Sequence, residues 1–218
     1  MKPKLIIFDF DGTLGDTRQN IIVTMQRTMQ RVGLPVKSDR ECASTIGLTL
    51  EDSFKVMYPD MSIEMAEQCV DAYRETFMES VEELIPELFP GVSDTLARLD
   101  AMGIKMSIAS SRQSQSLLLF LERMGVAQYF PYVLGSDNVV KHKPDPEPVL
   151  KTLRELDYSP SDVIVVGDMP VDVAMAHGAD VRAIAVTFGN ATREELIESK
   201  ADYIIDDFTK ILEIVETL

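Results

Sequence analysis

The sequence predicts an α/β protein with a doubly wound parallel sheet, into which a block of helices is inserted near the N-terminus. Three observations predict this class. Short apolar runs alternate with helix-like segments, glycines follow several of those segments, and one long stretch has helix-like segments alone. Strands that alternate with helices are typical of parallel sheets. The length of 218 residues allows one domain with its own core and a smaller inserted one.

Five apolar runs have the length and composition of strands that are buried on both faces of a sheet. They are Leu5–Phe8, Met106–Ala109, Val163–Val166, Ala183–Val186 and Tyr203–Ile205, with Val133-Leu134 as a weaker sixth. Between them lie the helical patterns Val92–Met102, Ser114–Met124, Pro148–Leu156, Val171–His177 and Arg193–Ser199. Glycine follows three of these patterns, at Gly103, Gly125 and Gly178, as the expected stop signal.

One region breaks this alternation. From about Asp16 to Ile85 no strand pattern is found, whereas apolar residues at helical spacing indicate a helix that Gly33 ends and another between Ile63 and Val81. We therefore expect two domains. Residues 1–14 and 86–218 form an α/β core, similar to a Rossmann fold, and residues 15–85 form an all-helical domain inserted into it.

Composition and charge exclude several classes of function. The net charge of −15 argues against nucleic acid or an anionic membrane as a partner, because both require clustered Lys and Arg. No apolar run approaches the roughly 20 residues that span a bilayer. Cys42 and Cys69 are far apart and lack metal-binding spacing, which favours a reducing, cytoplasmic location.

Polar side chains follow several of the predicted strands. Ligands of open α/β sheets bind beyond the carboxyl ends of the strands, so these residues form the candidate site. They are Asp9 and Asp11 after the first strand, Ser110 and Ser111 after the second, and Asp168 and Asp172 after Val163–Val166, with Lys143 before the helix at Pro148.

The acidic residues of this set predict a metal ion. Asp9 and Asp11 are two residues apart and could face one pocket, although a turn at Gly12 can redirect Asp11. Two carboxylates that share a site repel each other unless a cation lies between them. Oxygen ligands from Asp9 and Asp168, with no histidine nearby, favour Mg²⁺ over Zn²⁺ or Cu²⁺. Lys143 adds positive charge, and Ser110 with the backbone N–H groups around it can donate to the oxygens of an anion.

Four ordered motifs carry a resemblance to a known family. They are Asp9-Phe10-Asp11-Gly12-Thr13, Ser110, Lys143-Pro144, and Gly167-Asp168 with Asp172. In these motifs the chain resembles the haloacid dehalogenase-like superfamily, specifically its phosphatases with an inserted helical cap, and it is closest to phosphoglycolate phosphatase. Four motifs in order, over residues 4 to about 208, are a specific signal, whereas one motif alone is weak.

The resemblance implies a role for each of these residues. Asp9 attacks phosphorus and carries an aspartyl-phosphate, and Asp11 protonates the leaving oxygen and then activates water. Mg²⁺ is held by Asp9, the backbone carbonyl of Asp11, and Asp168, with Asp172 in contact directly or through water. Ser110, Ser111, Gly12 and Lys143 bind the phosphate. The expected substrate is a small phosphorylated metabolite, and the oligomeric state, monomer or homodimer, stays open.

Several alternatives remain at this point. The same core could serve a β-phosphoglucomutase-type phosphomutase, a pyrophosphatase, or a binding protein without catalytic activity. Ser110 could instead cap the following helix, and Asp172 could be a structural ion-pairing group. The cap segment Ile46–Asp52 resembles the substrate-facing loop of the family and contains no Arg or Lys, so it does not identify the substrate.

Overall fold

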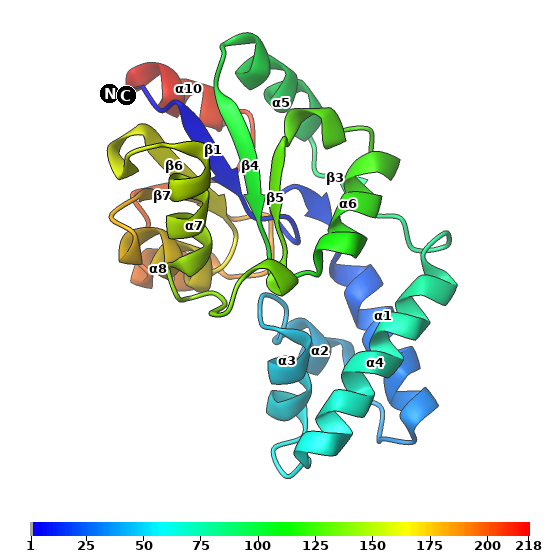
Figure 1. The fold of residues 1–218 in the computed structure, drawn as a ribbon. Coiled ribbons are helices and arrows are strands. Elements are labelled where there is room, and N and C mark those ends of the chain that lie inside the picture. Colours follow the sequence, from blue (N-terminus) through cyan, green and yellow to red (C-terminus); the bar gives the residue numbers. More distant parts are fainter. Residues whose placement is uncertain (1) are drawn as a thin grey trace. The chain divides into compact units, whose positions relative to one another are not determined.

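The computed structural model describes residues 2–218, so Met1, the first residue of the expected core, lies outside the described part. The predicted fold class is confirmed, since the chain forms a six-stranded parallel sheet and carries four helices inserted near its N-terminus. Backbone contacts divide the chain into two compact units. One consists of Met1–Asp16 and Glu87–Leu218, and the other of Thr17–Pro86. Figure 1 shows the path of the chain through both.

The sheet has the strand order β5-β4-β1-β6-β7-β8 and every neighbouring pair is parallel. Its strands are β1 (Leu5–Phe8), β4 (Lys105–Ala109), β5 (Tyr132–Leu134), β6 (Val163–Gly167), β7 (Arg182–Val186) and β8 (Tyr203–Ile205). All six expected strands are present, each within two residues of its predicted bounds. Strand β1 lies between β4 and β6, which come from distant parts of the sequence.

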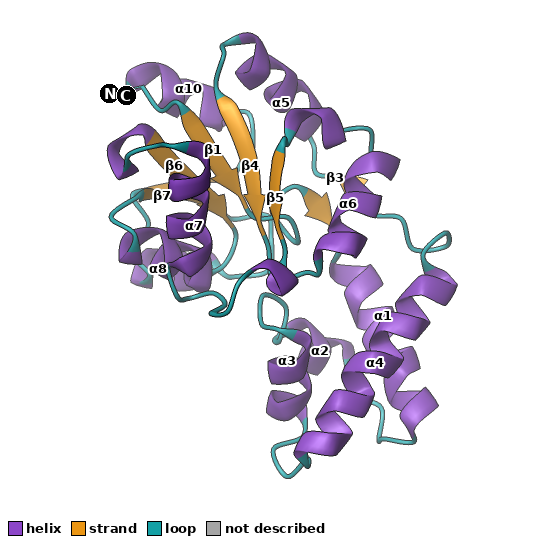
Figure 2. Ribbon diagram, viewed as in Figure 1, coloured by secondary structure: helices purple, strands orange, loops and turns teal. Residues whose placement is uncertain are grey.

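Helices cover both faces of this sheet (Figure 2). They are α5 (Val92–Ala101), α6 (Ser114–Arg123), α7 (Glu147–Leu156), α8 (Pro170–Gly178), α9 (Arg193–Glu198) and α10 (Lys210–Thr217), with short 3-10 turns at Ala127–Tyr129, Ser136–Asn138 and Pro160–Asp162. The end of α8 differs from the expectation. Gly178 belongs to the helix, and the left-handed residue that follows is Asp180, with φ of 58°.

Alternation along β1 explains the two-sided core. Leu5 and Ile7 point to the face where Val149 of α7, Val173 of α8 and Leu196 of α9 are buried. Phe8 points to the opposite face and packs against the rings of Phe130 and Phe208, at centroid distances of 6.2 and 5.9 Å. Each fully buried side chain of this kind contributes roughly 1.5–3 kcal/mol. Burial on both faces fixes the direction and register of β1, and therefore the place of the residues that follow it.

A short antiparallel ladder joins the two connections of the α/β unit. Strand β2 (Gly15–Asp16) pairs with β3 (Glu87–Leu88), with Gly15 opposite Leu88. The ladder brings together the chain that leaves the sheet after β1 and the chain that returns to it. Two residues per strand are too few for a periodic pattern, so this ladder could not be predicted from the sequence.

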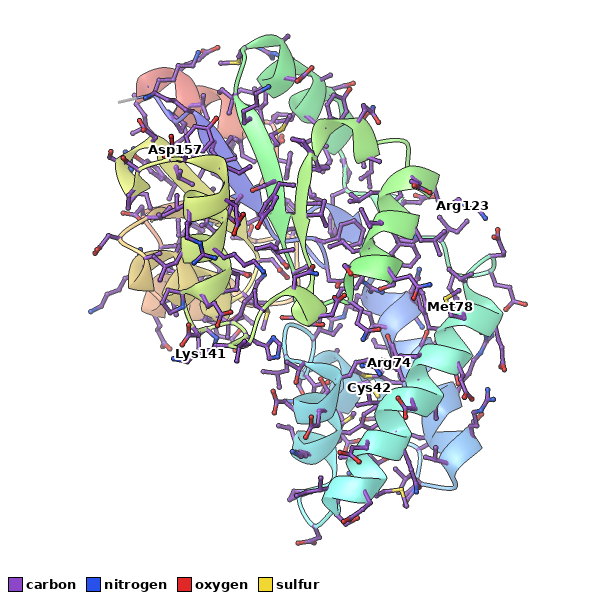
Figure 3. The ribbon with its side chains drawn as sticks, in the orientation of Figure 1. Cys42, Arg74, Met78, Arg123, Lys141 and Asp157 are labelled. Carbon is purple, nitrogen blue, oxygen red and sulfur yellow. The ribbon has the colours of Figure 1, made fainter. Side chains whose placement is uncertain are left out.

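The helical unit consists of α1 (Arg18–Val32), α2 (Asp39–Ala43), α3 (Leu50–Met57) and α4 (Ile63–Ser80). Ser38, Thr49 and Ser62 cap the last three of these helices through their hydroxyl oxygens. Helices α1 and α4 pack against each other, and Met29 and Phe77 are among the side chains buried in this unit. Cys42 on α2, labelled in Figure 3, and Cys69 on α4 are both buried free thiols.

Within residues 2–218, none of the helices has both the length and the apolar character needed to cross a membrane.

Candidate active site

Three adjacent strands place the candidate residues at one edge of the sheet. Asp9 follows β1, Ser110 follows β4 and Asp168 follows β6. The parallel pairing continues one residue beyond the strands, because the Asp9 amide donates to Val166 O at 2.8 Å and the Ser110 amide to Leu134 O at 2.9 Å. The carboxyl ends of parallel strands meet at this edge, so residues far apart in the sequence lie together.

Three carboxylates form a buried cluster at this edge. Asp9, Asp168 and Asp172 each contribute an oxygen, and these oxygens all lie within 4.8 Å of one another. The residues are 7%, 0% and 2% exposed. Buried carboxylates repel one another and lose hydration, which costs free energy unless cations compensate. The arrangement therefore requires positive charge.

Lys143 supplies part of that charge. Its Nζ lies 2.6 Å from Asp9 Oδ1 and 2.6 Å from Asp172 Oδ1, and its side chain is 4% exposed. Burial alone would lower the pKa of the Lys143 ammonium, but the carboxylates of Asp172 and Asp9 outweigh it and raise that pKa. Lys143 is therefore charged at neutral pH and joins two carboxylates of the cluster.

Lys143 alone does not balance the three carboxylates of the cluster. Three carboxylates and one ammonium carry two net negative charges when all are ionised. Burial raises the pKa of Asp9 well above its usual range. The charge of Lys143 opposes this shift, and the charges of Asp172 and Asp168 add to it. Burial and Asp172 raise the pKa of Asp168 to about 7. A group of close, buried oxygen ligands with uncompensated charge fits a divalent cation such as Mg²⁺.

Hydrogen bonds orient Asp168 within the cluster. Its Oδ2 accepts from the Asn190 backbone N–H at 2.6 Å and from Asn190 Nδ2 at 2.9 Å, and its Oδ1 accepts from Thr13 Oγ1 at 3.3 Å. Sequence reasoning did not select Asn190. The available signal was its position just after the segment Val186–Gly189, which follows strand β7.

Glycine makes this close packing possible, as Gly12 and Gly167 show. A Cβ on Gly12 would lie 2.2 Å from Asp168 Oδ2, and a Cβ on Gly167 would lie 2.3 Å from Asp172 Cβ. Gly12 also has a φ of +87°, which L side chains rarely adopt. Asp172 lies in the first turn of α8, where its Oδ2 accepts from the Met169 N–H at 3.0 Å.

Asp11 does not join the carboxylate cluster. The turn at Gly12 redirects its side chain toward Arg112, whose Nη2 lies 2.7 Å from Asp11 Oδ1 and whose Nε lies 3.1 Å from Asp11 Oδ2. Arg112 follows the predicted Ser110-Ser111 pair, but no role was predicted for it. Its contact with Asp11 bridges 101 positions of the chain.

Ser110 lies beside this pair and is 7% exposed. Its Oγ accepts from the Arg112 N–H at 3.2 Å, so the hydroxyl proton can be directed to another acceptor. Ser110 does not cap the following helix, because Asp137 takes that role by accepting from the Ser114 N–H at 2.7 Å. Ser111, the other predicted phosphate ligand, is partly buried next to it.

Comparisons with known proteins give a consistent picture. Residues 6–186 match the family described as haloacid dehalogenase-like hydrolase. "Probable phosphatase IndB" of Dickeya dadantii is 35% identical, with 97% of this chain and 93% of that protein aligned. "Pyrophosphatase PpaX" of Bacillus pumilus is 30% identical, covering 96% and 95%. "Phosphoglycolate phosphatase" of Vibrio parahaemolyticus is 28% identical, covering 97% and 96%.

A solved structure has the same fold. A protein from Bacteroides fragilis, described as a haloacid dehalogenase-like hydrolase, superposes with a TM-score of 0.91 at 30% sequence identity, over 96% of this chain and all of that one. The similarity therefore extends through both the sheet and the inserted helices.

Proposed function

Because the chain belongs to the haloacid dehalogenase-like hydrolases, we propose that it is a Mg²⁺-dependent phosphatase that acts on a small phosphomonoester. The observation that carries this proposal is the contact of Lys143 with both Asp9 and Asp172, inside a buried cluster of three carboxylates. Such a cluster gives a nucleophile, a cation and a place for a metal ion within one small volume. Phosphoryl transfer requires these three elements together.

In the proposed reaction Asp9 is the nucleophile. One of its carboxylate oxygens attacks phosphorus, the bond from phosphorus to the ester oxygen breaks, and the leaving oxygen takes a proton from Asp11. Asp11 then takes a proton from a water molecule that attacks the aspartyl-phosphate. Inorganic phosphate leaves and the Asp9 carboxylate is regenerated.

Other residues stabilise the charge that develops on the phosphoryl oxygens. Lys143 is fixed by its two carboxylate contacts, so its ammonium needs little reorganisation during the reaction. Ser110 and Ser111, together with backbone N–H groups near Gly12, are proposed to donate hydrogen bonds to the same oxygens. We assign the helical unit the role of a cap that excludes bulk water during transfer.

Asp9, Asp168 and the backbone carbonyl of Asp11 are the proposed Mg²⁺ ligands, and Asp172 contacts the ion directly or through water. Bound Mg²⁺ would neutralise the phosphate and the carboxylates and so allow two anions to approach. The hydrogen bonds from Asn190 hold the Asp168 carboxylate in one orientation, as is usual for groups behind a metal ligand.

We propose phosphoglycolate as the substrate, with pyrophosphate as the second candidate. Relatives with both names align over nearly the whole chain, at 28% and 30% identity. Both compounds are small, carry two anionic groups and have a phosphoryl group that could be transferred to Asp9, so the proposed phosphoryl transfer applies to both.

The nucleophile is tested by Asp9→Asn, which keeps the size of the side chain and removes its charge. We expect turnover of p-nitrophenyl phosphate with Mg²⁺ to fall by at least about 1,000-fold. The matched control is Asp206→Asn, because Asp206 is a surface carboxylate that pairs with Lys210. Substantial activity in the Asp9 variant would contradict the assignment, as would failure to trap phosphate on Asp9 in acid-quenched wild-type enzyme.

A further inference from the structure

Arg112 is a buried cation to which the proposed reaction gives no role. Its side chain is 8% exposed, whereas those of the ion-paired surface residues Lys4, Lys141 and Arg154 are 62%, 70% and 71% exposed. Burying a guanidinium with a carboxylate stabilises a fold little or not at all compared with apolar side chains. Stability alone therefore does not account for its position.

The side chain of Arg112 is held in one place. Its guanidinium lies over the ring of Phe120, with Cζ 4.9 Å from the ring centroid. Phe120 in turn stacks on Phe10 at 6.1 Å, and Phe10 lies between the two aspartates of the first motif. The Arg112 carbonyl accepts from the Ser136 N–H at 2.9 Å. The cation–π contact and the bonds to Asp11 orient the guanidinium, and the backbone bond holds the main chain of Arg112.

This fixed guanidinium lies beside the acid of the proposed reaction. Arg112 Nη2 is 2.7 Å from Asp11 Oδ1. A general acid must come within about 2.6–3.2 Å of the oxygen that it protonates. With Asp11 at that distance from the leaving oxygen, the guanidinium would lie within roughly 6 Å of the same oxygen.

From this geometry we propose that Arg112 determines substrate specificity by binding a second anionic group, carboxylate or phosphate, on the leaving group of the substrate. The inference rests on the proposed function and narrows its substrate class. Both phosphoglycolate and pyrophosphate carry such a group close to the bond that breaks. The Nε and Nη2 atoms of Arg112 contact Asp11, and the guanidinium also carries the N–H donors of Nη1, which suit the oxygens of a carboxylate and of a phosphate alike.

The test compares two substrates that differ in one charge. Phosphoglycolate and 2-hydroxyethyl phosphate both leave as alkoxides, so both need protonation, but only the first has a carboxylate. We expect Arg112→Gln to lower kcat/KM for phosphoglycolate by about 100-fold, the effect of one lost charge-assisted contact. For 2-hydroxyethyl phosphate the decrease should stay below about 5-fold. Arg112→Lys should restore part of the phosphoglycolate activity, mainly through KM.

Pyrophosphate forms a separate arm of the same experiment, since it carries phosphate in place of the carboxylate. A large loss with pyrophosphate and a small one with phosphoglycolate would identify phosphate as the recognised group, and the reverse would identify carboxylate. Arg154→Gln, which removes an exposed arginine, controls for the change in net charge. Circular dichroism melting of each variant controls for folding.

Equal losses on the charged and the neutral phosphomonoester would overturn the inference, because they would show that Arg112 only orients Asp11. The inference would also be overturned if the wild-type enzyme hydrolysed neither phosphoglycolate nor pyrophosphate with a higher kcat/KM than 2-hydroxyethyl phosphate. In both cases hydrolysis of p-nitrophenyl phosphate would leave the proposed function intact. Absence of hydrolysis of every phosphate ester by wild-type enzyme with Mg²⁺ would instead contradict the proposed function itself.

Discussion

Replacing Lys143 by methionine removes the buried cation that contacts two clustered carboxylates. The Nζ of Lys143 is 2.6 Å from Asp9 and 2.6 Å from Asp172, and the side chain is 4% exposed. Methionine keeps most of the side-chain volume. In the variant, the three carboxylates of Asp9, Asp168 and Asp172 would lie within 4.8 Å of one another without this cation. The folded state must then either keep uncompensated charge buried or bind protons at these carboxylates, and both cost free energy.

The magnitude follows from the burial of the pair. Removing one partner of a buried ion pair costs about 3–5 kcal/mol. For a chain of this size, each kcal/mol lowers Tm by roughly 2–4 °C, so Lys143→Met should lower the Tm of the metal-free protein by about 6–20 °C. Thermal unfolding followed by circular dichroism in EDTA at pH 7 measures this directly.

The matched control is Lys4→Met. Lys4 pairs with Asp162 at 3.1 Å, but its side chain is 62% exposed, so its loss should cost at most about 1 kcal/mol. If the two variants had the same Tm, the buried carboxylates would not depend on Lys143. The electrostatic account of the cluster would then be wrong.

Three more outcomes are expected. Gly12→Ala should destabilise the protein in urea by about 1–3 kcal/mol more than Gly103→Ala, because both have positive φ but only the Gly12 Cβ would meet neighbouring atoms; equal effects would exclude crowding. Asn190→Ala, which removes a 2.9 Å bond to Asp168, should weaken Mg²⁺ binding by about 10-fold in calorimetry, and unchanged binding would count against this role. Partial burial raises the pKa of Asp202, but hydrogen bonds from the Ala183 N–H and from His177 lower it more, so the net pKa is below the usual 3.8. The ionised Asp202 carboxylate therefore stabilises the fold above about pH 4, and this stabilisation is lost as the pH falls further. The Tm difference between wild type and Asp202→Asn should therefore shrink below about pH 4, and a constant difference would contradict it.

Much of the fold could be predicted because its signals are local. The run Leu5–Phe8 is apolar at every position, as a strand buried on both faces must be, and the structure has a strand at those residues. Gly103 and Gly125 end their helices with φ of 74° and 71°. The β2–β3 ladder could not be predicted, since strands of two residues have no periodicity.

The candidate site was partly visible in the sequence. Asp9, Asp168 and Lys143 were selected because each stands at a strand end or in a motif, and the structure brings them into one cluster with Asp172. Asn190 and Arg112 were not assigned roles. Asn190 contacts Asp168, 22 positions away, and Arg112 contacts Asp11, 101 positions away. No local sequence pattern indicates either pairing.

The sequence by itself determined the order of strands and helices along the chain, the inserted helical segment, and the kinds of side chain at the strand ends. It did so because apolar periodicity and glycine stops depend on neighbouring residues. Only the tertiary structure decided that Asp172 shares Lys143 with Asp9, and that Asp11 turns away to Arg112. These contacts depend on the spatial order of the strands in the sheet and on the turn at Gly12, where the absence of a Cβ leaves room for Asp168. The residues come within contact distance only after the sheet has assembled.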